Sequence, residues 1–121
     1  MAVNWKQYAY AKGADAALDG DFAAAKAYGK VKPGTQAIFW RSGLRWCRLH
    51  ISEIQRIYRR VEPVYGKLCC GGRSFFIERL VLVLHTGEEL VLHIGDDATK
   101  EAEILLQTLK ELHPNMEYGK V

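Results

Sequence analysis

The stretch SFFIERLVLVLHTGEELVLHIG, residues 74–95, restricts the choice of fold more than any other part of the 121-residue chain. Two runs rich in large apolar residues flank Thr86-Gly87, and this arrangement is typical of a β-hairpin. Leu80 to Leu84 form an unbroken apolar run, whereas a strand with one wet face alternates apolar and polar residues. The sequence therefore predicts a hairpin whose first strand is covered on both faces.

Four further strands are predicted before this hairpin, because turn signals separate short β-rich runs. KAYGKVK leads to Pro33-Gly34, a pair that suits the centre of a type II turn. QAIFWR and LRWCRLH flank Ser42-Gly43 and predict a second hairpin. EIQRIYRRVEPVYG alternates between a partly apolar face and a polar face, and Pro63 indicates a bend or a sheet edge. The total is six strands.

A C-terminal helix is predicted between Gly95 and Pro114. Its apolar residues share one stripe at alternating four- and three-residue spacing, comprising Ala98, Ala102, Leu105, Leu109 and Leu112. Asp96 or Asp97 is the expected N-cap. Ile104 lies off the stripe and is expected to be exposed.

At the N-terminal end of the chain, residues 1–25 predict a short helical extension to a single domain over residues 26–121.

Charge is distributed unevenly along the chain. Residues 26–79 carry twelve Lys and Arg against three Glu, whereas residues 80–121 carry three Lys against eight acidic residues. This pattern indicates either an anionic partner or two halves that attract each other in the fold.

No apolar run is long enough to cross a bilayer, no secretory signal is visible, and three cysteines do not suggest a disulfide framework. We therefore expect a cytoplasmic protein.

The loop YGKLCCGGRSFF, residues 65–76, has four possible interpretations besides a simple turn. Zinc sites use separated ligand pairs, but Cys69 and Cys70 are adjacent. A vicinal disulfide is strained, and no histidine-carboxylate motif marks a catalytic thiol. Gly71-Gly72-Arg73 resembles an anion nest but lacks a completing phosphate motif. A strand connection is the favoured interpretation, with no metal, no cofactor and no catalytic motif in the chain.

The segment FWRSGLRW is the strongest binding candidate. Arg41 and Arg45 flank the predicted hairpin tip, with Trp40 and Trp46 nearby. Arginine beside tryptophan can bind phosphates or lie at a membrane interface. The alternative is that both tryptophans pack inward and the arginines are solvated. The candidate binding residues in the whole chain are Lys30, Lys32, Arg41, Arg45 and Arg73.

Three segments together resemble a known fold family. ISEIQRIYRRVE enters a long basic strand, and LVLVLHTGEELVLHIGDD leads into KEAEILLQTLKELHP. These segments resemble pleckstrin-homology-like domains of the small bacterial type, over residues 26–113. The resemblance implies an α+β fold, an antiparallel sheet or partly open barrel of six to seven strands closed by a C-terminal amphipathic helix. The family has seven strands, so one of the long strands is expected to bend into two.

The family resemblance also bears on function. Members that bind phosphoinositides place basic residues on the first hairpin, and Lys30, Lys32 and Arg41 partly fill those positions. Other members bind proteins or each other. We expect a non-catalytic interaction module that binds a protein or itself, with Ile104 and an aromatic N-terminal segment (Trp5, Tyr8, Tyr10) as contacts. The alternative is binding of anionic lipid headgroups or another polyanion through residues 26–79, with lipid favoured over nucleic acid.

Overall fold

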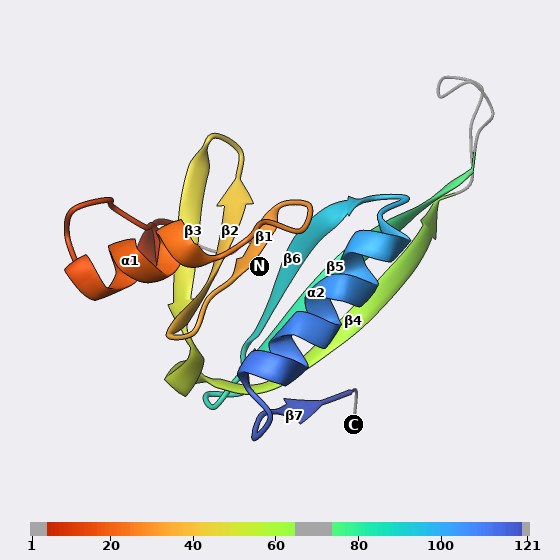
Figure 1. Cartoon of the computed structure of the whole chain (residues 1–121). Coiled ribbons are helices and arrows are strands. Elements are labelled where there is room, and N and C mark those ends of the chain that lie inside the picture. The colour runs from red at the N-terminus through yellow and green to blue at the C-terminus, as the bar shows by residue number, and fades with distance from the viewer. Residues whose placement is uncertain (1–4, 65–73, 120–121) are drawn as a thin grey trace.

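The computed structural model describes residues 5–64 and 74–119, which form an α+β fold with two α-helices and two β-sheets (Figure 1). The smaller sheet has the strand order β1-β2-β3 and the larger one β6-β5-β4-β7. The predicted α+β class is confirmed. Over the described ranges the two sheets do not close into a barrel, although the N–H of Lys30, just before β1, donates to the carbonyl of Ile94 in β6.

The smaller sheet consists of β1 (Val31–Pro33), β2 (Ala37–Ser42) and β3 (Arg45–His50), all antiparallel. Ser42 pairs with Arg45, so β2 and β3 are joined by a two-residue loop. Gly43, the first loop residue, has a φ of 65°. Two-residue hairpin loops need a positive φ at this position, and glycine adopts one readily. The predicted second hairpin is confirmed.

The turn between β1 and β2 differs from the prediction. A type II turn needs a positive φ at its second central residue, and Gly34 does not have one. Instead the Gly34 N–H donates to the Ala37 carbonyl, and the carboxylate of Asp21 accepts the N–H groups of Thr35, Gln36 and Ala37 at 2.7–3.1 Å. Asp21 belongs to helix α1 (Ala16–Ala24), so the helix fixes the turn.

The larger sheet contains two long strands, β4 (Ile54–Val64) and β5 (Phe75–Leu84), followed by β6 (Glu89–Asp96). The 3-10 turn η2 (Ile51–Glu53) joins β3 to β4. The ends of β4 and β5 extend beyond the rest of the molecule (Figure 1). The β5–β6 hairpin is confirmed. Of the run expected to be covered on both faces, Leu80, Val81, Leu82 and Leu84 are buried, whereas Val83 is only half-buried. Neither long strand divides in two; the seventh strand is β7 (Glu117–Tyr118), after the last helix.

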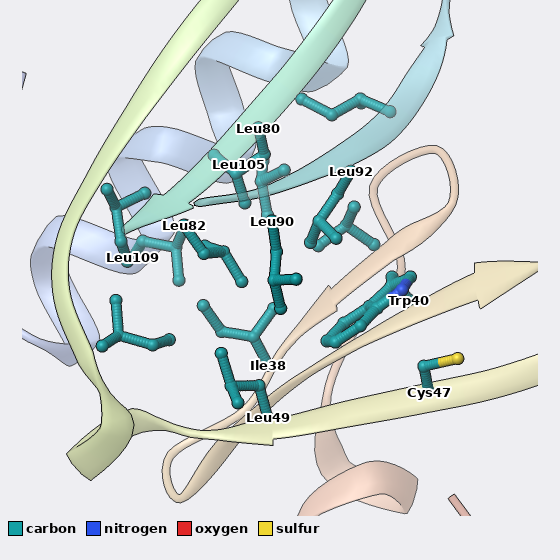
Figure 2. Packing of buried hydrophobic residues seen from close by; sticks show 14 of the residues in the cluster. Ile38, Trp40, Cys47, Leu49, Leu80, Leu82, Leu90, Leu92, Leu105 and Leu109 are labelled. Carbon is teal, nitrogen blue, oxygen red and sulfur yellow. The ribbon is translucent and has the colours of Figure 1, made fainter. Parts of the chain in front are cut away.

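Helix α2 (Thr99–Leu112) contacts both sheets and closes the core. The predicted apolar stripe is buried except for Leu112, which is 39% exposed, and Ile104 is exposed as predicted. The expected Asp N-cap is wrong: Ala98 occupies the cap position, and the Asp97 carboxylate instead accepts the N–H of Phe76. Figure 2 shows core side chains contributed by both sheets and the helix, including Ile38, Trp40, Cys47, Leu49, Leu80, Leu82, Leu90, Leu92, Leu105 and Leu109.

The N-terminal segment packs on the smaller sheet. Leu18 of α1 contacts Ala37 and Phe39 on the outer face of that sheet, where Phe22 and Tyr10 complete a second apolar cluster. The 3-10 turn η1 (Trp5–Tyr8) delivers Tyr8 to the main core. These contacts place apolar cover on both faces of the three-stranded sheet.

Candidate functional site

The outer edge of β4 is the candidate site. On this edge β7 runs parallel to β4 only at Arg56 and Ile57, and the N–H of Gly119 donates to the Ile57 carbonyl. The N–H and C=O of successive strand residues point to alternate sides, so those of Arg59, Val61 and Pro63 point to the same edge as those of Ile57. Among the residues that the structure describes, none pairs with this edge beyond Ile57.

Pro63 fits this edge because proline lacks a backbone N–H. Pro63 still pairs with Phe76 in β5. The missing N–H costs no hydrogen bond there, because the backbone groups of residue 63 point away from β5. The sequence-based interpretation of Pro63 as a bend or a sheet edge is thereby decided in favour of the edge. The open edge offers N–H groups from Arg59 and Val61 and carbonyl groups from Arg59, Val61 and Pro63.

Two exposed apolar side chains lie beside the open edge. Val61 is 41% exposed and Phe76 53% exposed. Val61 pairs with Glu78, and Pro63 pairs with Phe76, so both side chains are on the sheet face that α2 covers farther along. Exposed apolar residues next to unpaired backbone are typical of a surface that binds protein.

A cavity of about 380 Å³ continues the open edge toward α2. Its lining residues come from β4, α2 and the C-terminal segment and are Tyr58, Arg59, Arg60, Leu106, Lys110, Tyr118 and Gly119. The Tyr118 hydroxyl donates to the carbonyls of Leu109 and His113, both at 2.8 Å, and burial raises the pKa of this phenol. One wall of the cavity is therefore fixed to the end of the helix.

Charged side chains lie along the same strand on the face away from α2. Glu62 accepts from the guanidinium of Arg79 at 3.0 Å and forms an ion pair with Arg60 at 2.7 Å. The hydrogen bond from Arg79, together with the charges of both arginines, lowers the pKa of Glu62 below its ordinary value. The edge of β4 thus presents both a cation and an anion within three residues.

A second ion pair lies under the start of α2, with its carboxylate buried and its guanidinium partly exposed. The guanidinium of Arg59 binds both carboxylate oxygens of Glu78 at 2.7 and 3.0 Å, and the Thr99 hydroxyl donates to the same carboxylate at 3.2 Å. Glu78 is 0% exposed, and its hydrogen bond raises the pKa of Arg59. Removing one member of a buried pair leaves an uncompensated charge. This arrangement fixes β4, β5 and α2 relative to one another, which is a structural role.

The residues selected from the sequence for anion binding lie around the smaller sheet and do not form one cluster. The amino group of Lys32 lies 3.8 Å from the Phe22 ring centroid and donates to the Phe22 carbonyl. Lys32 and Arg41 both lie near the Trp46 ring, at 5.4 and 5.9 Å. Arg45 projects from the opposite face, one residue along from Trp46. Lys30 is exposed before β1, and Arg73 falls outside the residues described.

The aromatic candidates divide between the core and the outer face. Trp40 is 2% exposed and packs inward, whereas Trp46 is half-buried against Phe22 on the outer face of the smaller sheet. The inward packing expected for both tryptophans therefore applies to Trp40 alone. Tyr8 is buried in the main core, Tyr10 is part of the second cluster, and the side chain of Trp5 lies outside the described part of the structure.

Metal and thiol chemistry can be examined only for the described residues. The described ranges contain no group of three or more His, Cys, Asp or Glu that could bind a metal. Cys47 is buried, and this burial raises the pKa of its thiol, so the reactive thiolate is disfavoured. The loop with Cys69 and Cys70 is outside the described residues.

A larger cavity, of about 570 Å³, lies between η2 and the end of α2. His85 and His113 both line it, but His113 is hydrogen-bonded at 2.8 Å to the Gly34 carbonyl. No ion pair joins the two histidines to an acid in the part of the chain that is described. The cavity shows no paired acid-base groups among the described residues, so the edge of β4 is the stronger candidate.

No helix within residues 5–64 and 74–119 combines the length and the hydropathy needed to span a bilayer. Comparison of the chain with known protein families, with curated proteins and with solved structures gives no match in any of the three.

Proposed function

We propose that this chain is a non-catalytic interaction module that takes up an extended segment of a protein partner on the open edge of β4. The observation that carries the proposal is the edge itself, because the backbone groups of Arg59 and Val61 are oriented for pairing next to two exposed apolar side chains. Addition of a strand to a sheet edge is a recurrent mode of peptide recognition.

The two parts of the site have different roles in this mode. Backbone hydrogen bonds from Arg59, Val61 and Pro63 supply affinity with little dependence on the partner's sequence. Specificity comes from side-chain contacts, here with Val61, Phe76 and the cavity beside Lys110. An extended partner with alternating apolar residues, directed toward α2, matches this surface.

The finer fold assignment, a pleckstrin-homology-like domain, belongs to the same proposal. Two sheets whose strands β1 to β6 pair antiparallel, with an amphipathic C-terminal helix, support it, and β7, parallel to β4 after that helix, is a departure from the expected pattern. Since such a fold hosts more than one function, the assignment agrees with a binding role without specifying the partner.

The proposal is tested by selecting binders from a display library of extended peptides and measuring their affinity for variants of the full chain. Val61→Pro removes an N–H that points away from β5, so the β4–β5 pairing is retained while the edge loses a donor. We expect affinity to fall about tenfold or more, as for the loss of one hydrogen bond and its neighbours. Ile104→Ser, another exposed apolar position, is the matched control. Peptides that bind both variants equally well would place recognition elsewhere and refute the proposal.

A second candidate function is binding of an anionic surface, favoured by the approach of Lys32 and Arg41 to Trp46. It ranks second because Lys32 is engaged by Phe22, and Arg45 projects from the other face. We expect no salt-sensitive sedimentation with vesicles rich in phosphatidylserine. Strong sedimentation at low salt that is abolished by Lys30→Glu together with Arg41→Glu would instead establish the lipid function.

A further inference from the structure

We infer that the strand taken up by the open edge is β4 of a second copy of this chain, paired antiparallel about a two-fold axis at Val61. This inference rests on the proposed function, since it names the partner of the same edge. The open positions are Arg59, Val61 and Pro63, and Val61 is their centre. Antiparallel pairing about that centre places residue 59 opposite residue 63 of the second copy, and residue 60 opposite residue 62.

Most of the open backbone groups are paired in this register, and only the Arg59 carbonyl, which faces Pro63 of the second copy, receives no N–H. Val61 of each copy donates its N–H to the carbonyl of the other Val61, as in a hydrogen-bonded antiparallel pair. The N–H of Arg59 donates to the carbonyl of Pro63 in the second copy. Pro63 has no N–H to contribute, and this sets the limit of the paired segment. Ile57 keeps its pairing with β7, and Gly119, whose N–H donates to the Ile57 carbonyl, ends the paired segment there, so the second copy turns away from the edge after Pro63.

The side chains are self-complementary in the same register. Arg60 and Glu62 lie on the sheet face away from α2, and reversal of the strand places Arg60 of one copy opposite Glu62 of the other. Opposite charges at directly facing strand positions attract. Within one chain Arg60 pairs with Glu62 through a terminal nitrogen, and its Nε has no acceptor in the described part of the structure. The order Arg60-Val61-Glu62 therefore gives two cross-strand ion pairs per dimer.

On the other face, the two exposed Val61 side chains cover each other. Pairing of the edges joins two four-stranded sheets into one sheet that spans both copies. The contact uses the same surface on each copy, so it closes as a dimer and does not propagate into a fibre. A strand pairing of this length is small compared with stable dimer interfaces, which bury roughly 1,200–2,000 Å². The expected dissociation constant is accordingly in the micromolar range.

The test is sedimentation equilibrium of the full chain from about 5 to about 500 μM, a range that brackets micromolar affinity. The wild type is expected to shift from 13.7 kDa toward twice that mass. Arg60→Glu and Glu62→Arg should each weaken the dimer about tenfold, because each places like charges opposite one another. The double variant, and an equimolar mixture of the two single variants, should both restore it. Lys100→Glu, with the same change in charge at an exposed position of α2, should leave the dimer unchanged.

Circular dichroism and thermal unfolding confirm that each variant is folded, and the mixture of single variants provides rescue even if one of them is destabilised. A wild type that stays monomeric throughout overturns this inference, while retention of peptide binding at the edge leaves the proposed function in place. A dimer insensitive to Arg60→Glu, Glu62→Arg and Val61→Pro assigns the contact to another surface and also overturns it. Loss of the dimer in the single variants without rescue in the mixture rejects the register.

Discussion

The N-terminal segment pairs with the outer edge of the smaller sheet, and the C-terminal segment pairs with the outer edge of the larger one. The edge of β3 is met by the N-terminal segment, where Ala9 forms a bridge with Cys47 and the Tyr10 N–H donates to the Trp46 carbonyl. The edge of β4 is met by the C-terminal segment only at Arg56 and Ile57. Both segments act as covers for edges that otherwise promote association. The edge of β4 continues to Val64 beyond its cover, and it is the one available to a partner.

The anchors of the two covers also differ. The N-terminal cover is anchored by Tyr8 in the main core and by a hydrogen bond from Tyr10 to Asp19. The C-terminal cover depends on the Tyr118 hydroxyl and on an ion pair between Arg56 and Glu117. The Glu117 side chain is 59% exposed, and exposed ion pairs contribute little to stability. We therefore expect the C-terminal cover to open more readily than the N-terminal one.

The largest expected effect tests whether both regions share one core. Leu109 is 0% exposed and contacts residues of both sheets in the same cluster. Leu109→Ala should lower the free energy of unfolding by roughly 2–5 kcal/mol, in a single transition. Ile104→Ala, on the exposed face of the same helix, should change it by less than about 0.5 kcal/mol. An unchanged urea midpoint for Leu109→Ala would show that α2 does not close the core.

The next effect belongs to the smaller sheet alone. Asp21→Ala leaves three turn N–H groups without their acceptor, and we expect a loss of about 3 kcal/mol or less. Hydrogen exchange should accelerate at Thr35, Gln36 and Ala37 and remain unchanged in the β4–β5 ladder. Asp21→Asn keeps one carbonyl acceptor, so its free energy of unfolding should lie between those of the wild type and Asp21→Ala. If hydrogen exchange accelerated equally in both sheets, the two sheets would open together rather than independently.

A smaller effect concerns the C-terminal cover. Tyr118→Phe removes the hydroxyl that donates to Leu109 and His113, with an expected loss of about 1 kcal/mol. Exchange of the Gly119 N–H should accelerate, while that of the Tyr10 N–H should not. Tyr28→Phe, on a side chain that is half-buried but makes no such bond in the described hydrogen-bond network, is the control. In the wild type, the Tyr10 N–H should exchange more slowly than the Gly119 N–H, and this is the simplest check that the two covers differ in stability.

The smallest effect depends on pH. A hydrogen bond to Asp19 raises the pKa of Tyr10 to about 12 from an ordinary value of 10.0. Because the folded state holds this proton more tightly, the stabilisation is fully present below pH 10 and is lost as the pH rises toward 12. Tyr10→Phe should therefore show a shallower decline in stability between about pH 9 and about pH 11.5 than the wild type. Identical declines would contradict an anchoring role for the phenol.

Much of the fold could be predicted because its signals are local. The hairpin over residues 74–95 combines an apolar run with a glycine turn, and the stripe of α2 repeats at helical spacing. By contrast, the turn after Pro33 depends on Asp21, fourteen residues away in the case of Thr35, and no local pattern reveals that carboxylate. Asp97 resembles a helix cap in sequence, but the neighbouring strand uses its carboxylate to bind the Phe76 N–H.

The candidate site was less accessible to sequence reasoning because an edge is defined by what does not pair with it. Strand β7 is two residues long, and its sequence carries no strand signal, so its position could not be foreseen. Val61 and Phe76 resemble core residues in the sequence and are exposed only because β4 and β5 extend past α2. Pro63 was the one local indication, and it allowed a bend as well as an edge.

The close approach of the backbone at two glycines affects how relatives of this chain should be interpreted. A Cβ on Gly29 would lie 2.2 Å from the Ile94 carbonyl oxygen, and one on Gly34 would lie 2.3 Å from an Asp21 carboxylate oxygen. Both glycines are in GKVKPG, a segment that does not match the phosphate-loop motif. Homologous proteins should keep both glycines for steric reasons alone. Evolutionary constraint at positions 60 to 62, where exposed side chains could otherwise vary freely, would be the informative signature of a shared partner.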